Sequence, residues 1–79
     1  MMDLFTNYKF VINYNNEELK VYRKLIANQS VYIVFFTDGK KPLFLNRAMA
    51  PDYSMFWTSV PEGRQAEAEE IGPLIEEQL

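Results

Sequence analysis

The stretch from Val31 to Thr37 constrains the fold of this chain more than any other. It reads Val-Tyr-Ile-Val-Phe-Phe-Thr and is followed by Asp38-Gly39, a strong turn signal. The stretch is uncharged and rich in β-branched and aromatic residues, which favour strands. Apolar residues occupy both sets of alternating positions, as in strands that are buried on both faces. The sequence therefore predicts a central strand over 31–37 that needs cover on both faces.

A β-hairpin is predicted before this strand. Apolar and polar residues alternate from Tyr8 to Tyr14, and Asn15-Asn16 suits a two-residue turn because asparagine tolerates positive φ. We expect strands over 5–14 and 17–26. A register shift of one residue would destroy the apolar pairing that this turn creates. The predicted partners are Tyr14 with Glu17, Ile12 with Leu19, Phe10 with Val21 and Tyr8 with Arg23.

Two further strands and one helix are predicted after the central strand. Pro42 suits the start of a strand over 42–49, and a last strand over 55–60 ends at Pro61. The register of the hairpin at Asp38-Gly39 stays open. A helix is predicted over 64–79, because apolar residues recur there at helical spacing between glutamates. Gly72-Pro73 predicts a kink or two short helices meeting at Gly72, since proline removes a helical hydrogen bond. The apolar positions of this helix are Ala68, Ile71, Leu74, Ile75 and Leu79.

Sequential strands with short connections usually pair with their neighbours. We therefore expect an α+β fold, in which a five-stranded antiparallel meander carries one kinked C-terminal helix on one face. The 79 residues are expected to form a single domain over 1–79.

The sequence contains no cysteine and no histidine. This excludes disulfides and thiolate metal sites, and it removes the commonest metal ligand and the usual general base. No nucleophile motif, glycine-rich phosphate loop or metal-ligand spacing occurs. We therefore expect a protein that is not an enzyme, with no catalytic, cofactor-binding or metal-binding residues. Asp3 lies where an export signal needs basic residues, and no window approaches the roughly 20 apolar residues of a membrane span. A cytoplasmic protein without membrane contact is expected.

Charge is distributed unevenly along the chain. Residues 1–60 have a balance of +2 and residues 61–79 a balance of −5, which together give −3. The helix glutamates Glu67, Glu70 and Glu77 are candidates for a carboxylate pair or a hard-metal site. Because helical spacing turns them away from the apolar positions, we interpret them as a solvated surface. Asp38-Gly39-Lys40-Lys41 is interpreted as a hairpin turn and not as a phosphate site.

The main functional hypothesis follows from the shortage of cover for the sheet. A helix of about 15 residues is roughly 22 Å long and covers one sheet face at most. The last three predicted strands are apolar on both faces, so one face should keep an apolar patch, and such patches mark partner sites. We expect a non-enzymatic interaction or accessory module that docks on another chain or on itself as a homodimer. The predicted interaction face is Phe35, Phe36, Phe44, Phe56 and Trp57.

Two alternatives accompany this hypothesis. A strongly curled sheet would bury both faces as a small barrel, and Trp57 alone is better explained as a core residue under the helix. Separately, Lys9, Lys20, Tyr22 and Lys24 fall on the outer face of the first hairpin. An aromatic ring among cations on a sheet is typical of single-stranded nucleic-acid binding. Lysines on an edge hairpin also prevent strand pairing, and the chain is acidic overall, so nucleic-acid binding is the second hypothesis.

Overall fold

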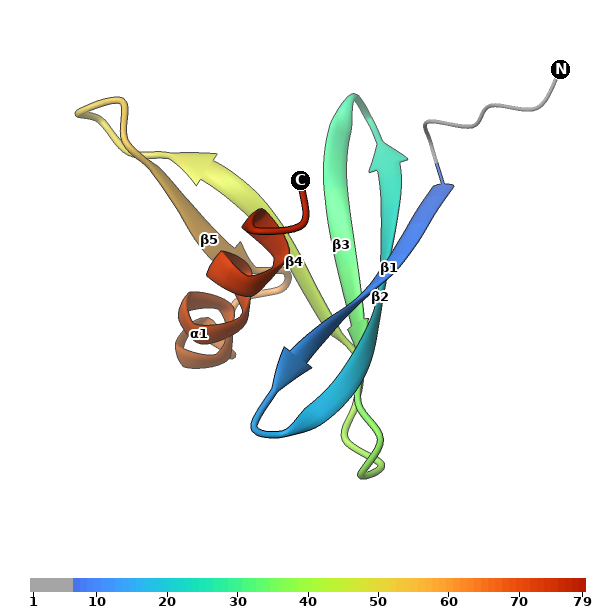
Figure 1. The fold of residues 1–79 in the computed structure, drawn as a ribbon. Coiled ribbons are helices and arrows are strands. Elements are labelled where there is room, and N and C mark those ends of the chain that lie inside the picture. Colours follow the sequence, from blue (N-terminus) through green and yellow to red (C-terminus); the bar gives the residue numbers. More distant parts are fainter. Residues whose placement is uncertain (1–6) are drawn as a thin grey trace, which may run out of the picture.

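The computed structural model describes residues 7–79, with side chains from residue 9 onward. This part of the chain forms one antiparallel sheet in the order β1-β2-β3-β4-β5, and α1 lies against one face of the sheet (Figure 1). The predicted α+β meander with a C-terminal helix is therefore confirmed. The elements are β1 (Asn7–Tyr14), β2 (Glu17–Ile26), β3 (Gln29–Phe35), β4 (Leu43–Met49), β5 (Met55–Ser59) and α1 (Gln65–Glu76).

The first hairpin has the predicted turn and register. Asn15 and Asn16 both adopt positive φ, at 53° and 65°, as a two-residue turn with the right twist requires. Ile12 pairs with Leu19 and Phe10 with Val21, so each apolar residue opposes another. Residues 5 and 6 of the predicted first strand lie outside the described residues.

The central strand begins two residues earlier than predicted and ends earlier, at Phe35. The reason is a second two-residue turn, in which Ala27 and Asn28 have φ of 51° and 66°. This turn lets Ile26 pair with Gln29 directly. A loop over 36–42 joins β3 to β4, and the open register of this hairpin is now defined by the pairing of Val34 with Leu43.

The helix α1 runs without a break through Pro73, so the alternative of two short helices is wrong. Pro73 itself is exposed, whereas the neighbouring Gly72 is buried. Ala68, Ile71 and Ile75 have no solvent exposure. Their packing against the sheet supplies stability that offsets the hydrogen bond lost at the proline.

The core lies between α1 and the inner face of the sheet, which curls around the helix (Figure 1). Val21, Val34 and Leu45 from the three middle strands have no exposed surface and form one cluster with Ile71 and Ile75. The curling does not close a barrel that buries both faces, because aromatic residues on the opposite face remain exposed. No helix within residues 7–79 combines the length and apolarity needed to cross a membrane.

Candidate interaction surface

The outer face is the face of the sheet turned away from α1, and a row of side chains crosses it. The strand registers place Tyr22 beside Ile33, and Ile33 beside Phe44. Val60 continues the row, because its N–H donates to the carbonyl oxygen of Phe44 at 2.8 Å. Phe35 flanks the row and meets the Tyr22 ring edge to face, with the ring centroids 5.3 Å apart. We call Tyr22, Ile33, Phe35, Phe44 and Val60 the outer apolar patch.

The outer apolar patch remains open to solvent. Tyr22, Phe35, Phe44 and Val60 are 38%, 39%, 40% and 44% exposed, while Ile33 between them is 9% exposed. A depression of about 360 Å³ beside Phe44 and Val60 extends the patch, and Pro42 and Pro61 also line it. Several large apolar side chains thus lie together on one open face, the arrangement that distinguishes partner sites from scattered surface hydrophobes.

The five residues of the predicted interaction face do not lie on one face of the sheet. Phe35, Phe44 and Phe56 are exposed, but Phe36 packs against the core and Trp57 is buried. Successive residues of a strand point to opposite faces, so two aromatic neighbours in sequence cannot share a face. Phe56 is also separate from the outer apolar patch, because it pairs with Ala48 at the far end of β4 and β5.

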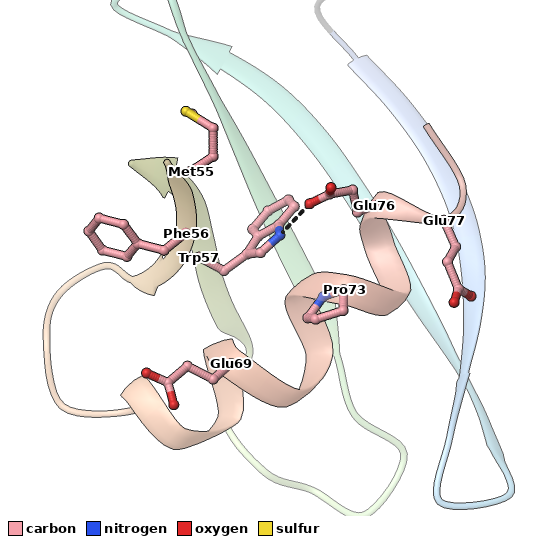
Figure 2. Close-up of a pocket in the computed structure, with 7 residues that line it drawn as sticks. All are labelled: Met55, Phe56, Trp57, Glu69, Pro73, Glu76 and Glu77. Carbon is pink, nitrogen blue, oxygen red and sulfur yellow. Dashed lines mark hydrogen bonds between the residues drawn. The ribbon is translucent and has the colours of Figure 1, made fainter. Parts of the chain in front are cut away.

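Trp57 is a core residue held from three sides. Its Nε1–H donates to Glu76 Oε1 at 3.0 Å, and its ring meets the Tyr32 ring edge to face at 5.3 Å. The Arg47 guanidinium lies 5.8 Å from its ring centroid. The interpretation of Trp57 as a core residue under the helix is confirmed. A groove of about 500 Å³ lies beside it (Figure 2), lined by Met55, Phe56, Trp57, Glu69, Pro73, Glu76 and Glu77.

The residues predicted to bind nucleic acid do lie together. Lys9 pairs with Tyr22 across the first hairpin, and Lys20 and Lys24 flank Tyr22 on the same face of β2. All three lysines are exposed. Within residues 7–79 none of them forms an ion pair. The outer face of the first hairpin therefore carries three lysines against one acid, Glu18, and has a net positive charge.

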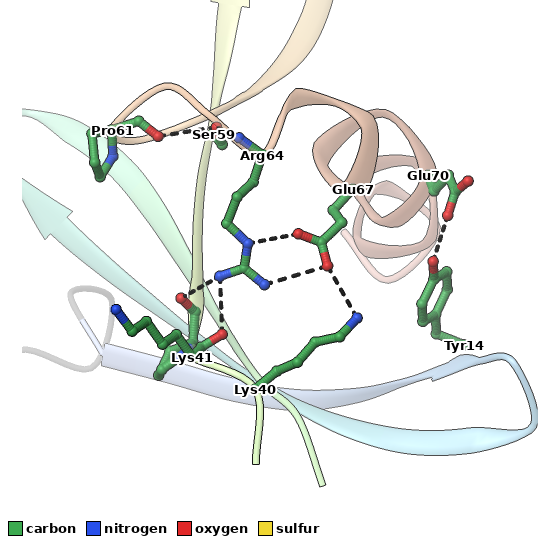
Figure 3. Close-up of polar contacts among 9 residues, drawn as sticks. Tyr14, Lys40, Lys41, Ser59, Pro61, Arg64, Glu67 and Glu70 are labelled. Atoms are coloured by element: carbon green, nitrogen blue, oxygen red, sulfur yellow. Dashed lines mark hydrogen bonds and ion pairs between the residues drawn. The ribbon is translucent and has the colours of Figure 1, made fainter. Parts of the chain in front are cut away.

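Of the three helix glutamates interpreted as a solvated surface, Glu70 and Glu77 are exposed, whereas Glu67 is half-buried and the interpretation is wrong for it. Glu67 accepts hydrogen bonds from Arg64 Nε at 2.6 Å and from Lys40 Nζ at 3.3 Å, and Glu70 accepts one from the Tyr14 hydroxyl (Figure 3). Because the sheet curls around α1, the flanks of the helix also face protein.

The Arg64 side chain ties the start of α1 to the loop before β4. Its Nη1 donates to the carbonyl oxygens of Lys41 at 2.9 Å and Pro42 at 3.0 Å. Its backbone N–H donates to Ser59 Oγ at 3.1 Å. Sequence reasoning missed Arg64, because Lys41 and Pro42 lie more than 20 residues away from it in the chain.

A pH dependence follows from Glu67. The hydrogen bond from Arg64 lowers the pKa of Glu67 below its ordinary value, and the hydrogen bond from Lys40 adds to this effect. A lowered folded-state pKa stabilises the protein above the unfolded-state pKa of about 4.3, and this stabilisation is lost as pH falls through the folded value. In urea unfolding between about pH 5 and pH 3, Glu67→Gln should therefore lose less stability than the wild type. Glu77→Gln, at an exposed position, is the matched control and should keep the wild-type slope. Equal slopes for Glu67→Gln and the wild type would contradict this assignment.

The described residues hold no group of three or more acidic side chains placed to bind a metal ion. What they bring together is an open apolar patch with a basic border. Comparisons of the chain with protein-family models, with curated protein sequences and with solved structures found no significant match.

Proposed function

We propose that this protein is a non-enzymatic protein-interaction module that docks through the outer apolar patch, and that the docked chain is a second copy of itself. The observation that carries the proposal is the outer apolar patch, which places four exposed side chains around Ile33 on an uncovered sheet face. We further propose that the module acts in the cytoplasm, which the absence of cysteine fits.

The distribution of charge favours a second copy as the occupant. All three lysines of the outer face lie on β1 and β2. The outward positions of β3, β4 and β5 are uncharged: Val31, Ile33, Phe35, Phe44, Asn46, Ala48, Phe56 and Thr58. Two copies that overlap mainly through this uncharged half, with Tyr22 at its border, keep their lysines at the margin of the contact, so like-charge repulsion is small.

The expected dimer is weak and reversible. Burying the remaining half of one large apolar side chain contributes about 1 kcal/mol, so four such side chains on each copy contribute about 8 kcal/mol. Association costs about 4 kcal/mol in lost rigid-body freedom at the low end of the usual range, which leaves about 4 kcal/mol and a Kd of about 1 mM. The module is thus expected to exchange between monomer and dimer.

Sedimentation velocity from about 30 µM to about 3 mM protein tests this proposal, a range that brackets the expected Kd. The wild type should sediment faster as concentration rises, and Phe44→Ser should remain a monomer because the substitution puts a polar group at the centre of the patch. Val11→Ser is the matched control: Val11 is 44% exposed but lies on β1, away from the uncharged half. A wild type that stays monomeric at the highest concentration would contradict the proposal.

A second candidate function is single-stranded nucleic-acid binding, which the position of Tyr22 among Lys9, Lys20 and Lys24 favours. It is distinguished by fluorescence anisotropy with labelled oligo(dT) of about 20 nucleotides, which spans the site sizes of sheet-surface binders. Binding that weakens with salt, and that the triple variant with Lys20→Ala, Tyr22→Ala and Lys24→Ala abolishes, would establish this function. The absence of binding at low salt would exclude it.

A further inference from the structure

The two edge strands of the sheet differ in whether their outward backbone groups already have hydrogen-bond partners. At the β5 edge, Gln65 Nε2 donates to the outward carbonyl oxygen of Trp57 at 2.8 Å, and the adjoining groove is lined by Glu69, Glu76 and Glu77. The start of α1 thus occupies part of the β5 edge, and charge there is negative. The β1 edge lies on the opposite side of the sheet.

The β1 edge presents alternate backbone groups outward. In a two-residue hairpin the residues that flank the turn, Tyr14 and Glu17 here, form a hydrogen-bonded pair. Pairs alternate along an antiparallel ladder, so Ile12 and Phe10 also bond to β2 while the N–H and C=O groups of Lys9, Val11 and Asn13 point away from it. Within residues 7–79 these outward groups have no backbone partner.

A groove follows this open edge. It has a volume of about 440 Å³ and is lined by Lys9, Phe10, Val11, Lys20, Tyr22 and Gln78. Phe10 contributes from the inner side, where it packs against the core, and Lys9 and Lys20 contribute from the outer side. Both lysines are exposed and unpaired within residues 7–79, and no acidic side chain lines the groove.

We propose that β1 binds an extended acidic segment of a partner protein as an added sixth strand. The open backbone groups of Lys9, Val11 and Asn13 supply the main-chain hydrogen bonds of strand addition. Acidic residues at alternate positions of the segment meet Lys9 on the outer face, and Lys20, opposite Val11 on β2, adds positive charge behind the edge strand. Apolar residues between the acidic ones meet Phe10 on the inner face. Lysines at an edge block pairing with basic or neutral strands, so the same residues select the partner by charge.

This inference shares with the proposed function only the assumption that the ligand is a protein. It does not depend on the dimer, because β1 lies outside the uncharged half of the outer face. A heptapeptide that alternates glutamate and valine, Glu-Val-Glu-Val-Glu-Val-Glu with blocked ends, is the probe. In an NMR titration of the full chain, the amides of Lys9, Val11 and Asn13 should shift most and become protected from hydrogen exchange. The matched peptide with lysine at every glutamate position should bind at least about tenfold more weakly, because it places like charges opposite one another.

Two substitutions of Val11 distinguish loss of strand addition at the β1 edge from loss of the fold. Val11→Pro removes an outward donor without removing a bond to β2 and should abolish binding, whereas Val11→Ala should bind within about threefold of the wild type. If Val11→Pro does not fold, the same heptapeptide with every backbone amide N-methylated supplies the test, since it has no N–H group to donate to β1 in either strand direction and should not bind. Absence of binding by the acidic peptide, or binding that leaves the β1 amides unprotected, would overturn the proposal. Phe44→Ser should bind the peptide normally, so failure of the dimer and failure of the edge site give different results.

Discussion

Replacing Gly72 by alanine should destabilise the protein by about 3 kcal/mol, at the upper end of the usual cost of overpacking a core. In an exposed helix the same change would stabilise by about 1 kcal/mol. Here a Cβ atom on Gly72 would lie 2.1 Å from Trp57 Cγ, 2.5 Å from its Cδ1 and 2.6 Å from its Cβ. These atoms are close to the backbone of β5, and Tyr32, Arg47 and Glu76 hold the ring, so Trp57 cannot turn away.

Urea and thermal unfolding followed by circular dichroism measure this effect. For a domain of this size, 3 kcal/mol corresponds to a fall in Tm of roughly 15 °C. Gly39→Ala is the matched control, because nothing lies within 4 Å of its Cβ position but its φ of +87° is unfavourable for alanine. It should cost only about 1 kcal/mol. A Gly72→Ala variant as stable as the wild type would show that α1 does not lie this close to β5.

Leu45→Ala should destabilise the protein by about 3 kcal/mol, whereas Phe44→Ser at the next position should cost about 1 kcal/mol or less. Leu45 has no exposed surface and belongs to the core under α1, while Phe44 is 40% exposed on the outer face. Truncation of Leu45 leaves a cavity in the core between the sheet and α1. Substitution of Phe44 removes a side chain that is already partly exposed to solvent, so less buried area is lost.

The same two variants distinguish an effect on the stability of the fold from an effect on self-association. Urea unfolding should place Leu45→Ala far below the wild type, and Phe44→Ser should fold but lose self-association. Equal destabilisation by the two substitutions would mean that both faces of β4 contribute to the fold of a single chain. In that case the outer apolar patch would be a structural feature and not a docking surface.

The local elements could be predicted because their signals lie within a few residues of one another. Asn15-Asn16 and the alternation around it determined both the turn and the register of the first hairpin. The β3–β4 hairpin was different: Asp38-Gly39 is compatible with loops of several lengths, so the pairing of Val34 with Leu43 could not be derived from the turn residues. A turn over Ala27-Asn28-Gln29-Ser30 is indicated by the sequence, but its two-residue form is not, because alanine rarely adopts positive φ.

The candidate site could be predicted only in part. The shortage of cover for the sheet predicted an open apolar face. Assigning residues to that face requires knowing which alternate positions of each strand point outward. The predicted set ignored this alternation and placed Phe36 and Trp57 on the same face as Phe35, Phe44 and Phe56. The contacts of Glu67 and Glu70 depend on how strongly the sheet curls around α1, a property that no local pattern encodes. Predicting the open β1 edge requires knowing which residues of β1 bond to β2 and which point away from it. The groove beside this edge also depends on the position of Gln78, which is far away in the sequence.

Self-association through the outer apolar patch is tested by an isotope-filtered NOE experiment on a mixture of labelled and unlabelled protein at about 1 mM, where a weak dimer is populated. Intermolecular contacts are expected from the rings of Phe35 and Phe44 and the methyl groups of Val60, and none from the acidic groove beside Trp57. A sample that shows no intermolecular contacts at this concentration, or contacts only through α1, would contradict self-association through this patch.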